Sequence, residues 1–305
     1  MTRKGTLRNP LVVLHGEGPA RPAGEVWLVG AGPGDPELLT IKALKALQAA
    51  DVVVHDGLVS EAILDLAPAS ARRLSVAKRK SRHSYAQDEI NRMLVAFALD
   101  GLCVVRLKGG DPFIFGRGGE ELEACRAAGV ACHVIPGVTA ALAVGAAAGA
   151  PLTHRGAAQA VTFVTGHAAA GGEPDLDWAS LAKANQTVVI YMGVSTAPAI
   201  AARLIAAGRD GATPALVVED VSLPTEQRIV TTLAGLAEAA AAVAGAALLI
   251  VGEAMALASS LPLVGRDSDA QHRRVGVSDA APAVHTPTLA AARPVPPHRG
   301  GGRIA

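Results

Sequence analysis

The sequence predicts an α/β fold whose sheets are mostly parallel and covered by helices on both faces. Short apolar runs alternate along the chain with segments of helical periodicity. The 305 residues are 50% hydrophobic and 18% charged, which is enough apolar material for a large core and excludes global disorder. Strands that alternate with helices form parallel sheets with both faces buried.

The chain divides into four predicted segments. Residues 1–24 are rich in Arg, Gly and Pro without periodicity and predict a flexible tail, and the proline-containing residues 263–305 predict a disordered one. Between them we expect an N-terminal α/β domain over 25–136 and a C-terminal α/β domain over 137–262.

Each element of the first domain follows from a local pattern. Four apolar runs predict buried strands, and three amphipathic segments predict helices; in the first of these, Leu38, Ile41, Leu44 and Leu47 recur near the helical period. The predicted strands are 26–29, 52–54, 103–107 and 130–135. The predicted helices are 37–50, 87–99 and 120–128.

The second domain repeats this pattern. A Gly- and Ala-rich segment, 137–149, predicts a helix between the two halves. Apolar runs then predict strands at 161–165, 187–191, 215–218 and 247–251, with helices at 196–207 and 233–243.

Composition excludes several classes of function. The chain has 28 Lys and Arg residues and 27 Asp and Glu residues, which gives a net charge of +1. The protein as a whole therefore has no electrostatic field that would attract nucleic acid or a membrane. Aromatic residues are only 3%, which argues against a single-strand surface built from stacked rings. We therefore expect neither nucleic acid nor a membrane as partner, and any electrostatic function must be local.

Cysteine usage indicates a reducing compartment. Cys103, Cys125 and Cys132 are odd in number and form no CxxC pair, so neither a disulfide framework nor a zinc or other metal site is expected. The apolar residues 11–14 are too few for a signal-peptide core. These features predict a cytoplasmic protein.

A glycine-rich turn, Gly30-Ala31-Gly32-Pro33-Gly34-Asp35-Pro36, follows the first predicted strand. A dinucleotide site is one interpretation, but Asp35 stands where the third glycine belongs, and two prolines remove N–H donors. A structural tight turn is a second. We favour a third, a turn that holds a neutral or cationic nucleoside by backbone contacts.

Two acids follow strands at the edge where open α/β sheets bind ligands. Asp56 ends the run 52–55, and Asp111 comes after Gly109 and Gly110. Structural alternatives are that Asp56 caps a turn and that Asp111 pairs with Lys108 or Arg106. Their shared position beside glycines favours a site.

Basic residues concentrate locally in this nearly neutral chain. A run of Lys78, Arg79, Lys80, Arg82 and His83 is joined near predicted loop ends by Arg106, Lys108, Arg117, His154 and Arg155. A solvated loop is the plain interpretation. A nucleic-acid site would need more aromatic partners than Tyr85, so a substrate with several carboxylates fits better.

Six motifs in order resemble the tetrapyrrole methylases over residues 25–258, and within them the branch that methylates uroporphyrinogen III at carbon. They are 30–36 (GAGPGDP), 108–121 (KGGDPFIFGRGGEE), 136–140 (PGVTA), 151–155 (PLTHR), 164–167 (VTGH) and 191–193 (YMG). The siroheme-synthase fusions of this family carry a further dehydrogenase and ferrochelatase module, for which we expect no room here.

The resemblance implies two α/β domains with a ligand cleft between them, and a homodimer. It implies S-adenosyl-L-methionine (SAM) as methyl donor, leaving S-adenosyl-L-homocysteine (SAH). The acceptor would be uroporphyrinogen III, methylated twice to precorrin-2 for siroheme and cobalamin biosynthesis.

The resemblance also implies the site residues. Asp56 would be the proton acceptor and Lys78 the proton donor, while Arg106, Asp111 and Arg117 would face the macrocycle. The donor contacts would be Pro33, Gly109, Gly110, Asp111, Ile114, Thr139, Ala140, Met192, Val221 and Ala247. Three neighbours depart from the family pattern: His55 and Gly57 replace Tyr and Arg, and Ala77 replaces a glycine.

Overall fold

A computed structural model describes residues 24–77, 85–168 and 174–258. The predicted tails, apart from Gly24, and the basic run from Lys78 to His83 lie outside these ranges. All the helices and strands below belong to one compact unit. The predicted domain boundary between residues 136 and 137 stays a prediction.

The first sheet is entirely parallel, as predicted. Its strands, in spatial order β3-β2-β4-β1-β5, are β1 (Glu25–Gly30), β2 (Val52–His55), β3 (Arg72–Ser75), β4 (Cys103–Lys108) and β5 (Ala131–Ile135). Only β3 was absent from the sequence prediction. It is an edge strand whose residues are mostly exposed, so it has no apolar run to reveal it.

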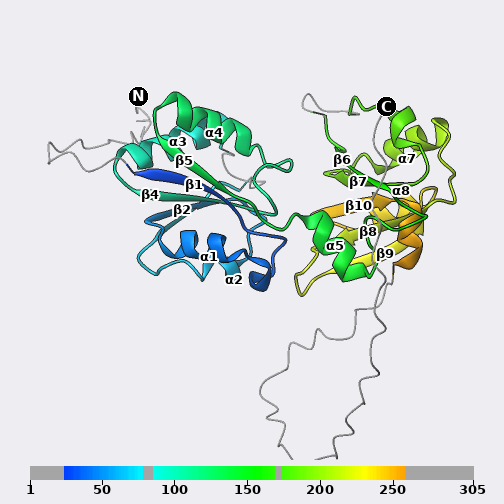
Figure 1. The fold of residues 1–305 in the computed structure, drawn as a ribbon, viewed down its shortest axis with the longest axis horizontal. Coiled ribbons are helices and arrows are strands. Elements are labelled where there is room, and N and C mark those ends of the chain that lie inside the picture. The colour runs from blue at the N-terminus through cyan, green and yellow to red at the C-terminus, as the bar shows by residue number, and fades with distance from the viewer. Residues whose placement is uncertain (1–23, 78–84, 169–173, 259–305) are drawn as a thin grey trace, which may run out of the picture. The chain divides into compact units, whose positions relative to one another are not determined.

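Helices cover both faces of this sheet (Figure 1). On one face lie η1 (Pro36–Leu38), α1 (Ile41–Gln48) and α2 (Glu61–Leu64); on the other lie α3 (Gln87–Leu99) and α4 (Gly118–Ala127). The predicted helix 37–50 is divided in two because Thr40 Oγ1 accepts the Ala43 N–H at 3.1 Å and starts α1 afresh.

The second sheet differs from the prediction of a mostly parallel arrangement. Its order is β6-β7-β10-β8-β9, with β6 (Ala160–Thr165), β7 (Gln186–Tyr191), β8 (Pro214–Glu219), β9 (Gln227–Thr232) and β10 (Ala247–Val251). Only β6 and β7 pair in parallel; the other three pairings are antiparallel. The connection 220–226 is too short for a parallel crossover, so β9 must return antiparallel to β8.

The second sheet is also covered on both faces (Figure 1). Its core against one face comes from α5 (Ala140–Ala148) and η2 (Glu253–Leu257), and against the other from α6 (Trp178–Leu181), α7 (Ala197–Ala206) and α8 (Leu236–Ala241). The helix predicted within 137–149 is thereby confirmed as α5. Edge strand β9 was missed, like β3, because most of its side chains are not buried.

Candidate active site

A cavity of about 820 Å³ lies at the carboxyl ends of the strands, where the sequence placed the ligand site. Its lining comes from the loops after β1, β2 and β4, from the start of α5, and from the loops after β7 and β8. Because β10 runs antiparallel to β7 and β8, its amino end joins this edge and brings Ala247 into the lining.

The structure brings the predicted site residues together in this one cavity. The lining includes Pro33, Asp56, Arg106, Gly109, Gly110, Asp111, Ile114, Arg117, Thr139, Ala140, Met192, Val221 and Ala247. Lys78 lies outside the described residues. The individual roles of all these residues remain predictions.

The glycine-rich turn is held by a close crossing of three backbone segments. Gly32 and Gly110 exchange two backbone hydrogen bonds, at 3.1 and 2.7 Å. A Cβ on Gly30 would lie 2.5 Å from the nitrogen of Gly137 and 2.7 Å from the oxygen of Gly110, so a side chain cannot enter here. Asp35 caps η1 by accepting the Glu37 N–H at 2.9 Å, which gives it a structural task in place of the third glycine.

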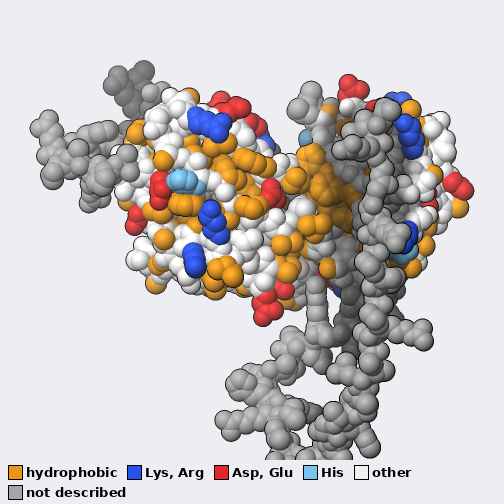
Figure 2. Space-filling model, viewed as in Figure 1, with side chains coloured by type: hydrophobic (Ala, Val, Ile, Leu, Met, Phe, Trp, Pro, Cys, Tyr) orange, Lys and Arg blue, Asp and Glu red, His pale blue; other side chains and the backbone are white. Residues whose placement is uncertain are grey.

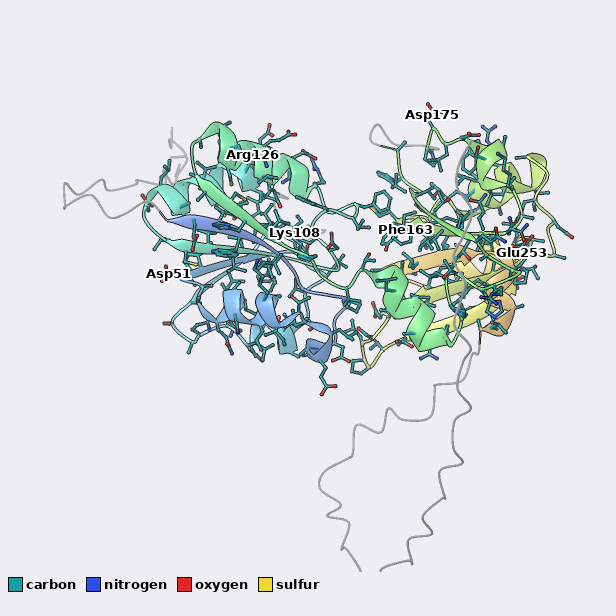
Figure 3. All side chains as sticks on the ribbon, in the orientation of Figure 1. Asp51, Lys108, Arg126, Phe163, Asp175 and Glu253 are labelled. Carbon is teal, nitrogen blue, oxygen red and sulfur yellow. The ribbon has the colours of Figure 1, made fainter. Side chains whose placement is uncertain are left out.

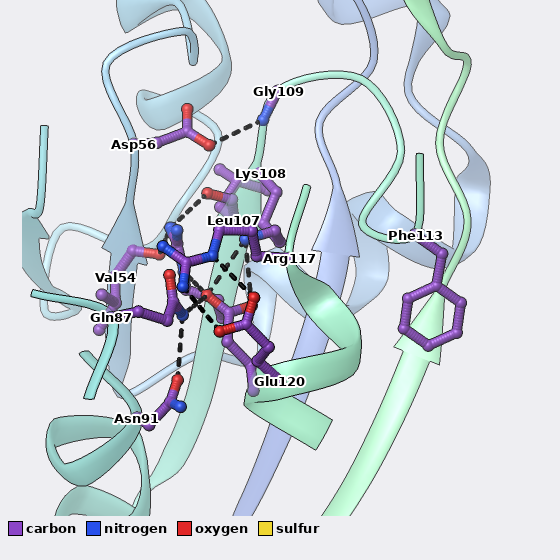
Figure 4. Close-up of polar contacts among 12 residues, drawn as sticks. Val54, Asp56, Gln87, Asn91, Leu107, Lys108, Gly109, Phe113, Arg117 and Glu120 are labelled. Carbon is purple, nitrogen blue, oxygen red and sulfur yellow. Dashed lines mark hydrogen bonds and ion pairs between the residues drawn. The ribbon is translucent and has the colours of Figure 1, made fainter. Parts of the chain in front are cut away.

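The two strand-end acids both bind backbone N–H groups. Asp56 Oδ1 accepts from Leu58 at 3.0 Å and Oδ2 from Gly109 at 3.2 Å (Figure 4). Asp111 Oδ1 accepts from Phe113 at 2.8 Å and Oδ2 from Gly137 at 3.0 Å. Asp111 therefore ties two loops of the cavity together instead of pairing with Lys108 or Arg106. Asp56 does cap a turn, and at the same time it lines the cavity.

Left-handed backbone conformations concentrate around the cavity. The lining residues Phe115, Arg117, Met192 and Asp220 have φ values of 53°, 58°, 55° and 50°. Side chains other than glycine rarely adopt this region, and such positions cluster at ligand sites because the surrounding structure must hold them there.

Tyr191 connects several predicted donor contacts, although the sequence analysis gave it no role of its own. Its hydroxyl lies 2.6 Å from Thr139 Oγ1 and accepts the Ala141 N–H at 3.3 Å. Its ring centroid lies 5.0 Å from that of Phe115. Burial raises the pKa of the Tyr191 phenol, so the hydroxyl stays protonated. The available signal was its place before Met192 in the motif 191–193.

A buried charged cluster, consisting of Arg106, Lys108 and Glu121 with Gln87, borders the cavity (Figure 4). Glu121 Oε1 accepts from Arg106 Nε at 2.9 Å, from Lys108 Nζ at 3.1 Å and from Gln87 at 3.3 Å. Glu121 has no role among the sequence-based predictions. Its position beside Glu120 in a run of glycines and acids does not reveal which of the two points inward.

The third predicted acceptor contact, Arg117, forms an exposed pair. Arg117 Nε donates to Glu120 Oε1 and Arg117 Nη2 donates to Glu120 Oε2, each at 2.7 Å. These bonds raise the pKa of Arg117 and lower the pKa of Glu120. The two residues stand at the start of α4, and Arg117 lines the cavity together with the buried Arg106.

Two of the departures from the family pattern lie side by side. A Cβ on Gly57 would come within 3.1 Å of the Ala77 Cβ, which is tighter than ordinary van der Waals contact. A side chain at position 57 would therefore be crowded by the methyl group at position 77. The third departure, His55, places Nδ1 3.0 Å from the Asp56 carbonyl oxygen.

Large apolar side chains reach the surface at the cavity, among them Leu58, Phe115 and Met192. Figure 2 shows apolar groups in orange on one face of the molecule, and Figure 4 shows the Phe113 ring pointing away from the charged cluster.

Within the described ranges, no three His, Cys, Asp or Glu side chains are grouped to hold a metal ion. No helix in that part of the chain has the length and hydropathy to cross a bilayer.

Comparison with known proteins identifies the family. The family model of the Tetrapyrrole (Corrin/Porphyrin) Methylases matches residues 25–237. A solved uroporphyrin-III C-methyl transferase from Thermus thermophilus, complexed with S-adenyl homocysteine, is 44% identical with a TM-score of 0.67. The similarity covers 77% of this chain and 100% of that one.

Curated relatives are longer than this chain. Siroheme synthase 1 of Cronobacter sakazakii is 49% identical over 279 residues, which are 91% of this chain and 59% of the relative. The siroheme synthase of Gluconobacter oxydans is 52% identical over 244 residues, covering 79% of this chain and 51% of the relative. The chain thus spans little more than half the length of these proteins. By its family match and these identities, the chain belongs to the tetrapyrrole methylase family.

Proposed function

We propose that this chain transfers methyl groups from SAM to two carbon atoms of uroporphyrinogen III, forming precorrin-2 for siroheme and cobalamin biosynthesis. One observation carries the proposal. Segments far apart in sequence converge on a single cavity, and they are the segments that the family resemblance assigns to donor and acceptor. The solved relative with bound S-adenyl homocysteine supports the choice of donor.

The residues present fit such a donor. The cavity volume lies within the range of small-molecule sites. Part of the wall is backbone, at Gly32 and Gly110, and part is apolar, at Val218, Val221 and Ala247. When bound, the sulfonium supplies a methyl group that needs no further activation by the protein.

Catalysis by these residues is mainly positioning. Holding two reactants in line can contribute about 7–11 kcal/mol in favourable cases. The turns at Gly32 and Gly110 are joined by two backbone hydrogen bonds, and Asp111 binds the Gly137 N–H. These bonds fix the part of the cavity wall that would position the donor. Asp56, fixed by two backbone N–H groups, presents a carboxylate that can orient a pyrrole N–H or accept the proton lost after carbon methylation.

The direct test is an anaerobic incubation of the purified chain with SAM and uroporphyrinogen III, followed by mass measurement of the tetrapyrrole. We expect two added methyl groups and one SAH released per methyl. An unchanged acceptor, or methylation of a different tetrapyrrole only, would reject the proposed substrate. Binding of SAH by calorimetry tests the donor separately.

We further propose that the chain acts as a homodimer in the cytoplasm. Free thiols at Cys103, Cys125 and Cys132 suit a reducing compartment. Light scattering on the eluted protein gives the mass, and a mass of one chain at working concentration would reject the dimer.

A further inference from the structure

Two buried cations stand on one face of β4, at its carboxyl end. Arg106 and Lys108 alternate along the strand, so both side chains point to the face covered by α3 and α4. Their exposed fractions are 4% and 3%, although this position of an α/β sheet is ordinarily apolar. Figure 3 places Lys108 among the strand ends of the first sheet.

Their shared carboxylate, Glu121, is fully buried, with 0% exposure. Lys108 Nζ lies 3.1 Å from each of its oxygens, and Arg106 Nε lies 2.9 Å from Oε1. Two cations against one carboxylate leave one positive charge in excess. Among the described residues, Glu121 Oε2 accepts no hydrogen bond, and it forms an ion pair with the Lys108 ammonium at 3.1 Å.

The cluster is oriented towards the cavity. Arg106, Lys108 and Gln87 belong to its lining, whereas Glu121 lies behind them on α4. Arg106 donates through Nε to Glu121 and through Nη1 to the carbonyl oxygens of Val54 and Leu107. Lys108 has a single carboxylate partner and three N–H donors, so it retains capacity for another acceptor.

Stability alone gives little reason for such a cluster. A buried ion cluster is commonly no more stable than apolar residues of the same volume, because desolvation offsets the Coulomb attraction. An unbalanced cluster is worse still unless a ligand supplies the missing charge. Its location at a cavity therefore indicates a ligand with negative charge.

We propose that Lys108, oriented by the buried carboxylate of Glu121, binds one carboxylate of the anionic tetrapyrrole acceptor. The inference deepens the proposed function and rests on it. Glu121 acts as a positioning residue: it holds the ammonium in place and favours its charged form. The sequence placed Lys108 among several basic residues suited to a carboxylate-rich substrate, but it gave Glu121 no role and did not pair the two.

The charge on Lys108 makes this contact pH-dependent. Burial lowers the pKa of the Lys108 ammonium, and the neighbouring Arg106 on β4 lowers it further; Glu121 on α4 and Asp56 after β2 oppose the shift. The ammonium is present below that lowered pKa and is lost as pH rises through it. As pH rises, acceptor binding is therefore expected to weaken earlier than it would if Lys108 had the pKa of an exposed lysine.

The test uses uroporphyrin III, the stable oxidised ring with the same carboxylates, in absorbance titrations of the full chain from neutral to alkaline pH. Lys108→Met leaves Arg106 and Glu121 as a balanced pair, so the fold is expected to hold. We expect its affinity for the ring to fall about tenfold at neutral pH, with SAH affinity unchanged. Lys108→Arg keeps its charge at all these pH values, so it is expected to bind without the alkaline loss seen in the wild type.

Glu121→Gln and an exposed lysine complete the design. Glu121→Gln removes the carboxylate that favours the charged form of Lys108. The pH at which half of the ring affinity is lost is therefore expected to be lower in this variant than in the wild type. Lys42→Met, an exposed change on α1, is the matched control and is expected to behave as wild type. Wild-type affinity in Lys108→Met, or equal losses of ring and SAH affinity, would overturn the proposal. Failure of the wild type to bind the ring would overturn it too, whereas failed methylation with normal ring binding would reject only the proposed function.

Discussion

The loops of the first sheet and those of the second contribute different chemistry to the same cavity. From the first come most of its charged groups: Asp56, Arg106, Lys108, Asp111 and Arg117. From the second come mainly apolar and backbone surfaces, including Met192, Val218, Val221 and 244–248, with Asp220 as a charged exception. We therefore expect the anionic acceptor to depend most on the first sheet and the neutral adenosyl part of the donor on the second.

The two regions also hold their shape in different ways. On the first sheet, ion pairs and carboxylate-to-backbone bonds fix the loops, as at Glu121 and Asp111. On the second, Tyr191 fixes the start of α5 through neutral hydrogen bonds to Thr139 and Ala141, and its ring contacts Phe163 on β6. Substitutions that act on only one region test this division.

The largest expected effect is on stability in the charged region. Glu121→Ala leaves Arg106 and Lys108 buried without a counter-ion and should lower the free energy of unfolding by about 3–5 kcal/mol. Urea denaturation measures it. Glu123→Ala, an exposed neighbour on the same helix, should change the value by less than about 0.5 kcal/mol. Similar losses in both variants would contradict the assigned role of Glu121.

The second-largest effect is expected from Asp56→Asn, which should lower the turnover rate. The amide keeps the shape of the side chain but loses the charge, so kcat for methylation should fall about 10²-fold while SAH affinity stays unchanged. Asp51→Asn, at the opposite end of β2, is the control, because Asp51 Oδ2 accepts the Cys103 N–H at 2.8 Å and Asp51 is not among the described residues that line the cavity. Unchanged turnover in Asp56→Asn would remove Asp56 from the mechanism.

A smaller effect should appear in the second region. Tyr191→Phe retains the ring contacts but loses the hydrogen bond to Thr139, so SAH affinity should fall about fivefold, near 1 kcal/mol. Uroporphyrin III affinity should not change. Combining Tyr191→Phe with Thr139→Val tests the pair, and additive losses would show that the two hydroxyls do not act together.

The smallest expected effect is at Thr187 on β7. Its hydroxyl is buried, and Oγ1 has no hydrogen-bond partner within the described part of the chain. Thr187→Val should therefore leave SAH affinity unchanged and leave stability equal or raise it by up to about 1 kcal/mol. A loss of SAH affinity as large as that of Thr139→Val would show that any change near β7 disturbs the donor region.

Local sequence patterns were enough to predict the buried strands and the residues that follow them at the cavity. The apolar runs at 26–29 and 103–107 predicted β1 and β4, and glycines and acids after strands predicted residues that line the cavity. The edge strands β3 and β9 escaped, because an exposed strand carries no apolar run. A single helix was predicted at 37–50, whereas the structure has two elements there, η1 and α1. The prediction did not recognise Thr40 as the N-cap of α1.

The sequence by itself determined that this chain builds covered sheets with glycine-rich turns and acids at the strand ends, and its motifs determined the family. Only the tertiary structure decided the direction of β10, since a buried strand has the same apolar pattern whether it pairs in parallel or antiparallel. It also decided that Glu121 is buried against Lys108 while Glu120 faces Arg117 at the surface. Adjacent residues on a helix point in different directions, and packing against β4 selects which of the two carboxylates is buried.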